Sequence, residues 1–335
     1  MACNAQETAV VHAAVRTDCR GTSPPGEVPR IWRGVKSRQV YEVAGKGETQ
    51  GMGQRQFRIP LLSAVLMCAI VASAHGQTLP MEPSHVQGAS VTGAYEGWFR
   101  NPDGTYSMLL GYFNRNLNQD VDIPIGPNNR IEPGGPDRGQ PTHFMVGRQY
   151  GLFAVKVPAD FGKNKITWTL TANGQTTVIP ASLHVDYEIS PWLEVMGNTP
   201  PVLRFEKTGP SVQGPQGFTT TRTATAGTPL PLDVWVSDDA RLSTTSGARP
   251  KNPGPPAVVL WTKFRGPGNV KFANEKPAVE KVAGYDPDSK FSGKASTSAT
   301  FSEPGEYILH VVVNDWSEIG FQCCWTNGTV KVQVR

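Results

Sequence analysis

The segment ATFSEPGEYILHVVVND, residues 299–315, indicates how this chain folds. A Pro-Gly turn precedes Tyr307, and the apolar run 307–313 has the length and composition of a β-strand. The nearby run GTVKVQV, residues 328–334, alternates valines with Lys331 and Gln333, which is the period of a strand with one buried face. We expect Tyr307 to form a tyrosine corner, in which the phenol bonds to upstream backbone and closes a Greek-key crossover.

The same pattern extends outward over most of the chain. We expect further C-terminal strands at 230–236, 257–264, 269–273 and 298–301, and N-terminal strands at 91–100, 105–114, 150–158, 165–170 and 176–180. The turns 101–104 and Asn173-Gly174 predict two hairpins. The Pro- and Gly-rich segment 125–141 predicts a long loop without regular structure.

These segments predict an all-β protein with two immunoglobulin-like β-sandwich domains in tandem. The domains span residues 91–190 and 224–335, after a leader at 77–90 and with a Pro- and Gly-rich junction at 191–223 between them. The high count of 35 Gly and 29 Pro fits many turns and short strands, and 38% hydrophobic residues are too many for a disordered chain. Residues 77–335 carry equal numbers of basic and acidic side chains, so no nucleic-acid partner is expected.

Residues 52–76 have the layout of a secretory signal peptide. Arg55 and Arg58 precede an apolar run at 59–74, and a site of small residues allows cleavage after Ala74 or Gly76. The alternative is a membrane anchor, but the run is shorter than the roughly 20 residues that span a bilayer. We therefore expect a secreted or periplasmic protein without a transmembrane span after cleavage, and we interpret residues 1–51 as a disordered or untranslated extension.

Three segments resemble the immunoglobulin-like modules of the polycystic-kidney-disease (PKD) repeat type, which are common in exported bacterial proteins. They are AGTPLPLDVWVSDDA (226–240), VVLWTKFRGPGNVKF (258–272) and ATFSEPGEYILHVVVND (299–315). LWTKFRGPG stands where that family has Trp-x-Phe-Gly-Asp-Gly, so the resemblance implies the fold class more than strict membership. It implies a non-catalytic binding, adhesion or spacer module of the cell envelope or secretome, with a protein or carbohydrate ligand. The first domain resembles no family that we can name.

The strand order of such a sandwich predicts a site at one end. The loops after 230–236 and 307–313 lie at the same end of an immunoglobulin-type fold. They carry Asp238, Asp239, Asn314, Asp315 and Glu318, whose oxygens suit calcium. The alternative is that these residues initiate turns, since Asp and Asn side chains imitate backbone turns.

Cys323 and Cys324 are the two cysteines that remain after signal cleavage. Adjacent α-carbons lie about 3.8 Å apart, below the usual disulfide minimum of about 4.4 Å. The sequence leaves three arrangements open: a strained vicinal disulfide that stiffens the loop, two buried thiols, or a link between molecules.

Enzyme signatures are scarce, because the chain has no Gly-x-Ser-x-Gly, phosphate-loop or His-Glu-x-x-His motif. The alternative to a binding protein is an accessory domain of a secreted hydrolase or metal-dependent enzyme, with its chemistry in the loop 126–141. The polar residues of that loop are Asn128, Arg130, Glu132, Asp137 and Arg138.

A sugar-binding platform could be formed by four aromatic residues, Trp98, Phe99, Tyr106 and Trp192. The alternative is that they belong to the core, because aromatic residues on strands are more often part of a core.

Overall fold

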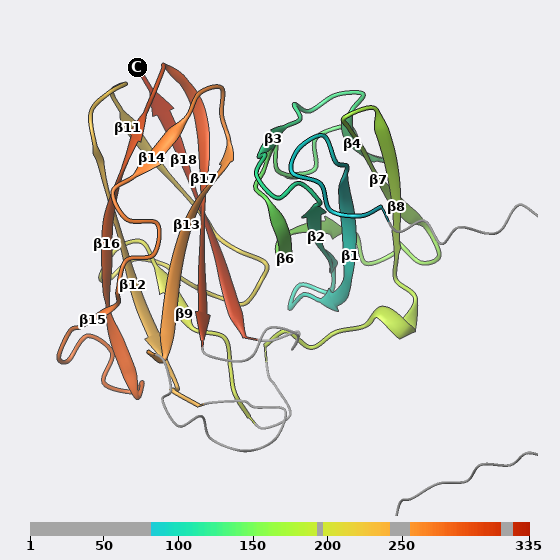
Figure 1. Ribbon diagram of the computed structural model, residues 1–335. Helices are drawn as coiled ribbons and strands as arrows, with labels where there is room; N and C mark the ends of the chain where they lie inside the picture. Colours follow the sequence, from blue (N-terminus) through green and yellow to red (C-terminus); the bar gives the residue numbers. More distant parts are fainter. Residues whose placement is uncertain (1–81, 193–196, 242–254, 316–323) are drawn as a thin grey trace, which may run out of the picture. The chain divides into compact units, whose positions relative to one another are not determined.

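The computed structural model describes residues 82–192, 197–241, 255–315 and 324–335. These residues form β-strands and a single 3₁₀ turn, Val185–Tyr187 (Figure 1). The predicted extension 1–51 and signal peptide 52–76 lie outside the described residues. No helix in the described ranges has the length and hydropathy needed to cross a membrane.

The N-terminal strands form three small sheets. The first contains β1 (Val91–Arg100), β2 (Tyr106–Asn114) and β6 (Gly147–Val157), in the order β1-β2-β6. The second contains β4 (Asn129–Glu132), β7 (Lys165–Ala172) and β8 (Gln175–Ser182), in the order β4-β7-β8. A third, two-stranded sheet pairs β3 (Val121–Asp122) with β5 (His143–Phe144).

Both predicted hairpins are present. β1 and β2 pair antiparallel around the turn at 101–104, and β7 pairs with β8 around Asn173-Gly174. Asn173 and Gly174 have φ angles of 49° and 76°. These left-handed conformations suit a tight hairpin, because they match the twist of the flanking strands.

The expectation that 125–141 lacks regular structure is wrong for its centre. β4 lies inside this segment and pairs with β7, from Asn129 opposite Leu170 to Glu132 opposite Thr167. Asn129 and Ile131 are fully buried, whereas Glu132 is exposed. The buried and exposed residues alternate over only four positions, and Pro and Gly residues flank them, so the pattern does not predict a strand. Burial of Ile131 in the core stabilises this strand.

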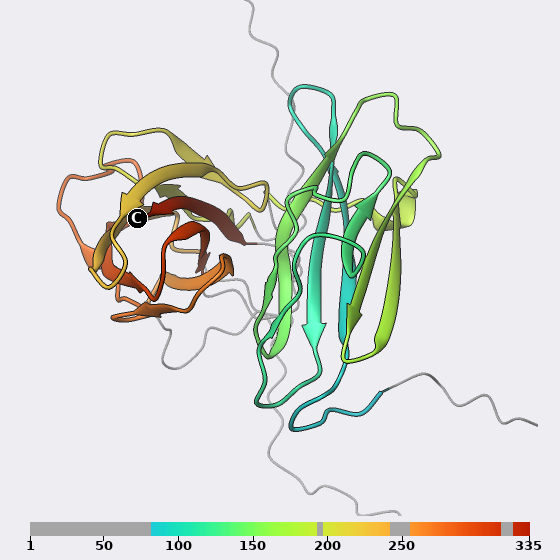
Figure 2. The same cartoon turned by 90° about the horizontal axis from the view of Figure 1, so that it is seen from above.

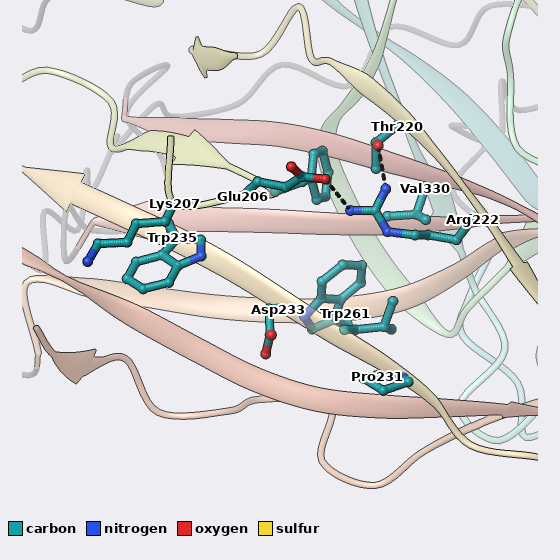
Figure 3. A pocket seen from close by; sticks show the side chains of 11 residues that line it. Glu206, Lys207, Thr220, Arg222, Pro231, Asp233, Trp235, Trp261 and Val330 are labelled. Atoms are coloured by element: carbon teal, nitrogen blue, oxygen red, sulfur yellow. Dashed lines mark hydrogen bonds and ion pairs between the residues drawn. The ribbon is translucent and has the colours of Figure 1, made fainter. Parts of the chain in front are cut away.

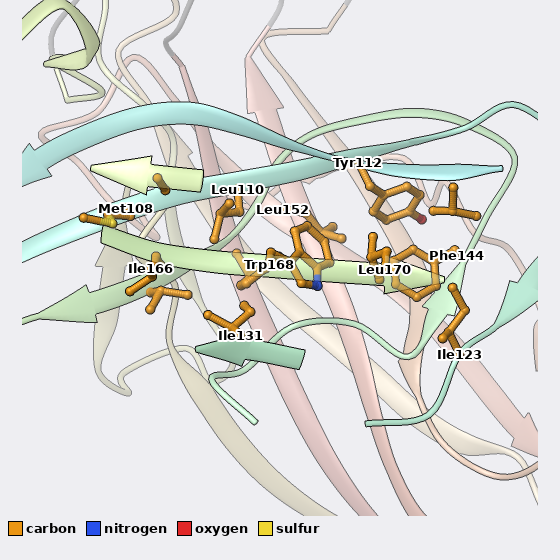
Figure 4. Packing of buried hydrophobic residues seen from close by; sticks show 14 of the residues in the cluster. Met108, Leu110, Tyr112, Ile123, Ile131, Phe144, Leu152, Ile166, Trp168 and Leu170 are labelled. Carbon is orange, nitrogen blue, oxygen red and sulfur yellow. The ribbon is translucent and has the colours of Figure 1, made fainter. Parts of the chain in front are cut away.

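The N-terminal core lies between the sheets β1-β2-β6 and β4-β7-β8. Its buried side chains alternate along the strands, and Trp168 lies among aliphatic residues and close to Phe153 and Phe144 (Figure 4). The Phe153 and Trp168 rings meet edge to face, with centroids 5.2 Å apart. The pairing of large aromatic and aliphatic side chains from two sheets is what stabilises a β-sandwich.

The C-terminal strands form two further sheets. One has the order β10-β9-β12-β16-β14, with β15 attached to β16, and the other has the order β11-β18-β17-β13. The strands are β9 (Val202–Arg204), β10 (Ser211–Gln213), β11 (Thr219–Ala224), β12 (Leu230–Asp238), β13 (Ala257–Arg265), β14 (Val270–Phe272), β15 (Glu280–Lys281), β16 (Phe291–Phe301), β17 (Gly305–Asp315) and β18 (Trp325–Val334). This pairing is that of an immunoglobulin-like sandwich. Seen from above, the yellow-to-red strands surround a common interior (Figure 2).

The predicted junction 191–223, in which VLRFE at 202–206 is the one short strand candidate, contains β9, β10 and all but the last residue of β11. β9 pairs with β12, and β11 pairs in parallel with β18. The first strand of the sandwich therefore divides into two pieces that join opposite sheets. The segment between the two pieces contains the Pro and Gly residues that suggested a linker.

Tyr307 forms the predicted tyrosine corner. Its side chain is fully buried, and its hydroxyl donates to the carbonyl oxygen of Glu303 at 2.9 Å. The same hydroxyl accepts the backbone N–H of Gly268 at 3.1 Å. The phenol thus ties the turn before β17 to the loop after β13.

Candidate functional site

Two aspartates end strands of the two different sheets at one end of the C-terminal sandwich. Asp238 is the last residue of β12 and Asp315 the last of β17, and both are buried. The pKa of Asp238 is raised to about 7, mainly by burial and further by the negative charges of Asp315 and Asp239. Asn198 donates from Nδ2 to Asp315 Oδ2 at 2.5 Å. The charges of Asp239 and Asp315 therefore act on Asp238 at this end of the sandwich, while the predicted calcium site stays a prediction.

Asp238 and Asp239 also stabilise the turn that follows β12. Asp238 Oδ1 accepts the N–H of Ala240, and Asp239 Oδ1 accepts the N–H of Arg241, each at 2.9 Å. Ala240 has a φ of 51°, a left-handed conformation that this side-chain bonding supports. One carboxylate oxygen each of Asp238 and Asp239 therefore acts as the turn interpretation predicts, by accepting a backbone N–H of the turn. Asp238 Oδ2 is buried without a hydrogen-bond partner.

The other residues of the predicted site are placed differently. Asn314 precedes Asp315 in β17, so its side chain points to the opposite face of the sheet. Glu318 and Cys323 lie outside the described residues. Cys324 is fully buried and disulfide-bonded, while the predicted pairing with Cys323 stays a prediction. Within the described ranges, His, Cys, Asp and Glu side chains form no group of three suited to a metal ion.

A pocket of about 290 Å³ adjoins this end of the sandwich. Asp238 and Asp239 line it together with Asp286 and Asp288, two acidic residues outside the predicted site. Asp286 and Asp288 belong to the loop between β15 and β16. Their sequence signal, an Asp-Pro-Asp turn, is also that of an ordinary loop.

The polar residues of loop 126–141 hold this loop in place. Arg138 donates to the carbonyl oxygens of Pro133 at 2.7 Å and Lys156 at 2.9 Å. Buried Asn129 donates to two carbonyl oxygens and accepts the indole N–H of Trp168 at 3.1 Å. Glu132 pairs with Arg130 at 2.9 Å. Most of the polar residues proposed for chemistry in this loop therefore have structural partners.

Asp137 of the same loop binds Arg265 at the end of β13. The guanidinium donates to both carboxylate oxygens, at 2.8 and 2.9 Å, and Arg265 Nε donates to the carbonyl oxygen of Gln140 at 2.8 Å. Hydrogen bonding to Arg265 lowers the pKa of Asp137. The adjacent backbone adds a bond from Thr142 N–H to Phe264 O at 3.1 Å. Loop 137–142 is thereby fastened to residues 264–265.

Two further contacts join the same parts of the chain. The Phe264 side chain belongs to the N-terminal hydrophobic cluster, although its strand belongs to a C-terminal sheet. The carbonyl oxygen of Gly151 accepts from Asn327 Nδ2 at 2.8 Å and from Trp325 Nε1 at 3.2 Å. We call these contacts, together with the Asp137–Arg265 and Thr142–Phe264 bonds, the joint.

His310 is buried next to the joint. Its Nε2 lies 3.1 Å from Asn327 Oδ1, and its ring lies 6.0 Å from that of Phe264. Burial lowers the pKa of His310 to about 4. The imidazole is therefore neutral at physiological pH, as expected of a packing residue rather than a general base.

The aromatic residues near the 101–104 turn belong mainly to the interior. Trp98 and Phe99 are buried, and the Trp98 indole N–H donates to the carbonyl oxygen of His184 at 2.7 Å. Tyr106 packs against Trp98, and Trp192 packs against Phe99 with ring centroids 4.7 Å apart. These residues contact one another, which confirms the core interpretation for Trp98 and Phe99.

A second cavity lies at the edge of the C-terminal sandwich. It has a volume of about 380 Å³ and contains Trp235 from β12 and Trp261 from β13 (Figure 3). No sequence motif marks this pocket. The residues that line it come from β11, β12, β13, β18 and the segment after β9, so only the folded chain assembles them.

The comparisons with known proteins assign no family to the chain. No family model matches it, and no curated protein matches it. Among solved structures, the D0-D1 domain of intimin has 11% identity and a TM-score of 0.22, with 73% of this chain and 98% of that chain covered. Domains 4 and 5 of the S-layer protein SbsC have 12% identity and a TM-score of 0.19, with the same coverage. The Yersinia pseudotuberculosis adhesin InvE has 10% identity and a TM-score of 0.20, with 74% of this chain and 59% of that chain covered.

Proposed function

We propose that this chain is an exported, non-catalytic binding, adhesion or spacer protein of a bacterial envelope or secretome. In this proposal two immunoglobulin-like domains follow a signal peptide at 52–76, and the mature protein is secreted or periplasmic. The observation that carries the proposal is the joint, because it fastens the N-terminal strands to the C-terminal sandwich with named, directional contacts.

A fastened joint suits a spacer or a binding protein. Domains linked only by flexible chain reorient freely, and relative motion is the default for small or polar interfaces. Here a bidentate Arg265–Asp137 ion pair and the buried Phe264 side chain oppose that motion. A protein that holds a ligand-binding surface at a set distance from its attachment point needs this stiffness.

Amide hydrogen exchange tests the joint directly. The Thr142 N–H bonds to Phe264 O, so it is protected only while the joint is closed. We expect strong protection in the full chain, and faster exchange at 140–145 in an Arg265→Ala variant. The control is Arg130→Ala, which removes an arginine from the same loop region but no joint contact. Exchange of Thr142 at an unprotected rate in the unmodified protein would contradict the proposal.

Export is tested separately by mass spectrometry of the exported protein. We expect a mature N-terminus at His75 or Gln77, and no peptide from residues 1–51. A peptide from 1–51 in the exported product, or retention of the whole chain in the cytoplasm, would exclude this reading of the N-terminal segment.

Calcium stays a second proposal, centred on Asp238, although the described carboxylates by themselves form no group of three suited to a metal ion. The specific support is Asp238 Oδ2, a buried carboxylate oxygen without a hydrogen-bond partner and close to a second negative charge. A bound cation would compensate this repulsion. We expect millimolar calcium to raise the Tm of the protein and to have no such effect on an Asp238→Asn variant. An unchanged Tm would contradict the calcium proposal and support the interpretation that these aspartates only stabilise a turn.

A further inference from the structure

The cavity of Figure 3 exists because the sandwich is open along one edge. β12 runs from Leu230 to Asp238, but β9 pairs only with its last part, Trp235–Ser237. The chain then leaves this sheet, and β11 continues in the opposite sheet beside β18. The earlier part of β12 and β11 thus face each other across a gap, where the cavity of about 380 Å³ lies (Figure 3).

The inner wall of the cavity is apolar and contains one unused hydrogen-bond donor. Phe205, Leu232 and Val330 form the apolar wall together with Trp261. The Trp261 side chain is fully buried, and its Nε1 has no hydrogen-bond partner. An unpaired buried N–H costs about 1–3 kcal/mol, so such groups are rare unless a ligand or water satisfies them.

Other buried tryptophans in the chain show that this is unusual. Trp98 donates to His184 O and Trp168 donates to Asn129 Oδ1. Trp261, which is among the residues that line the cavity, therefore differs from these two tryptophans in its unpaired N–H. We take this N–H as the donor for an acceptor atom of a bound ligand.

The rim of the cavity carries charges of both signs. Glu206 and Asp233 oppose Lys207 and Arg222, and Arg222 Nη1 donates to Thr220 Oγ1 at 3.0 Å (Figure 3). The Arg222–Glu206 pair is long, at 3.4 Å, and the side chains are 33% and 70% exposed, so both groups can rearrange around a ligand. A balanced rim offers donors and acceptors without selecting a strongly charged ligand.

One wall of the cavity is an aromatic ring held in position. The Trp235 ring lies 4.8 Å from that of Tyr285, and the ammonium groups of Lys207 and Lys294 each lie 5.7 Å from its centroid. Lys294 is itself held by Asp233 at 2.9 Å. Rigid aromatic surfaces beside a few polar groups are typical of small-ligand sites.

From these features we propose that the cavity binds a neutral sugar ring in the pyranose form, as a terminal unit of a glycan. This inference rests on the proposed binding function and names its ligand class. The apolar face of the ring would pack against the aliphatic and aromatic wall. One hydroxyl oxygen would accept from Trp261 Nε1, and others would bond to Glu206, Asp233 and Arg222 at the rim.

The test uses the full chain and saturation-transfer NMR with glucose, galactose, mannose and N-acetylglucosamine as separate probes. We expect at least one of them to bind. A Trp261→Phe variant keeps an aromatic ring but removes the donor, and we expect it to weaken binding at least tenfold. Trp98→Phe is the matched control, because it removes an indole N–H outside the cavity, and it should leave the affinity unchanged. Arg222→Ala, at the partly exposed rim, should also weaken binding if Trp261→Phe proves unstable.

Several results would overturn the proposal. These are no binding of any neutral pyranose, binding only of inorganic phosphate or galacturonate, capture of an extended peptide in place of sugars, or unchanged affinity in both Trp261→Phe and Arg222→Ala. The outcome is independent of the joint, because hydrogen exchange at Thr142 reports on residues that do not line this cavity. A failed sugar experiment with a protected Thr142 would therefore reject the ligand class and leave the proposed spacer role standing.

Discussion

At Asp238, burial and two neighbouring carboxylates act on the same group in the same direction. Each favours the neutral acid, which raises the pKa of Asp238 to about 7 from its ordinary value of 3.8. Between these values the folded protein binds more protons here than the unfolded chain does. The stabilisation by this proton is therefore present below about pH 4 and is lost as the pH rises through about 7.

We predict that replacing Asp238 by Asn removes this pH dependence. In the unmodified protein the free energy of unfolding should fall between about pH 4 and about pH 7, by at most about 1.4 kcal/mol per pH unit. Asp238→Asn should flatten the curve and be the more stable protein at pH 8. The measurement is urea unfolding at several pH values without calcium, with Asp160→Asn, an exposed loop residue, as the control. Parallel curves for both variants and the unmodified protein would refute the shift.

At Tyr307, one hydroxyl joins two loops. We predict that Tyr307→Phe keeps the ring packing but lowers the free energy of unfolding by about 1–3 kcal/mol, because the Gly268 N–H and the Glu303 carbonyl lose their partner. Chemical denaturation measures this loss. The control Tyr106→Phe removes a hydroxyl with only a long contact, 3.4 Å to Arg100, and should change little. Equal effects of the two substitutions would disprove the structural role of the corner.

At the scale of elements, the hairpins follow from local sequence, whereas two short strands depend on distant pairing partners. The hairpins at 101–104 and 173–174 are local, so their turn residues predict them. β4 and β11 instead form because distant strands, β7 and β18, provide their pairing partners. The sequence around them indicates a loop and a junction, and tertiary pairing overrides that indication.

The β7–β8 hairpin offers a clean test of backbone conformation. Gly174 has a φ of 76°, and an added Cβ would meet no atom within 4 Å. Gly174→Ala should thus lower the stability by about 1–2 kcal/mol through the left-handed conformation alone. Gly174→Asn should lose less, because Asn tolerates this region. Thermal unfolding compares the three proteins, and an unaffected Ala variant would show that the turn adopts another form.

At the scale of the whole molecule, the joint couples loop 137–142 to the end of β13. The Asp137 side chain is 51% exposed and that of Arg265 17% exposed, so solvent screens part of their attraction. A double-mutant cycle with Asp137→Ala and Arg265→Ala should give a coupling energy of about 0.5–1 kcal/mol, measured by urea unfolding. The pair Glu132 and Arg130 is the matched control within one loop. A coupling of zero for Asp137 and Arg265 would show that the joint depends on Phe264 and Gly151 instead.

The sequence by itself determined the all-β class, both hairpins, most strands of the C-terminal sandwich and the tyrosine corner. These features depend on local alternation and turn chemistry, which neighbouring residues carry. It also placed Asp238, Asp239 and Asp315 at one end, because strand order dictates which loops meet.

Only the tertiary structure decided where the polar groups find partners. Asp137 meets Arg265 across 128 positions of sequence, and Asn327 meets Gly151 across 176. Trp261 Nε1 is left without an acceptor, and no local pattern records this. Hydrogen-bond satisfaction depends on which atoms lie within about 3 Å in space, and a linear pattern contains no such distance.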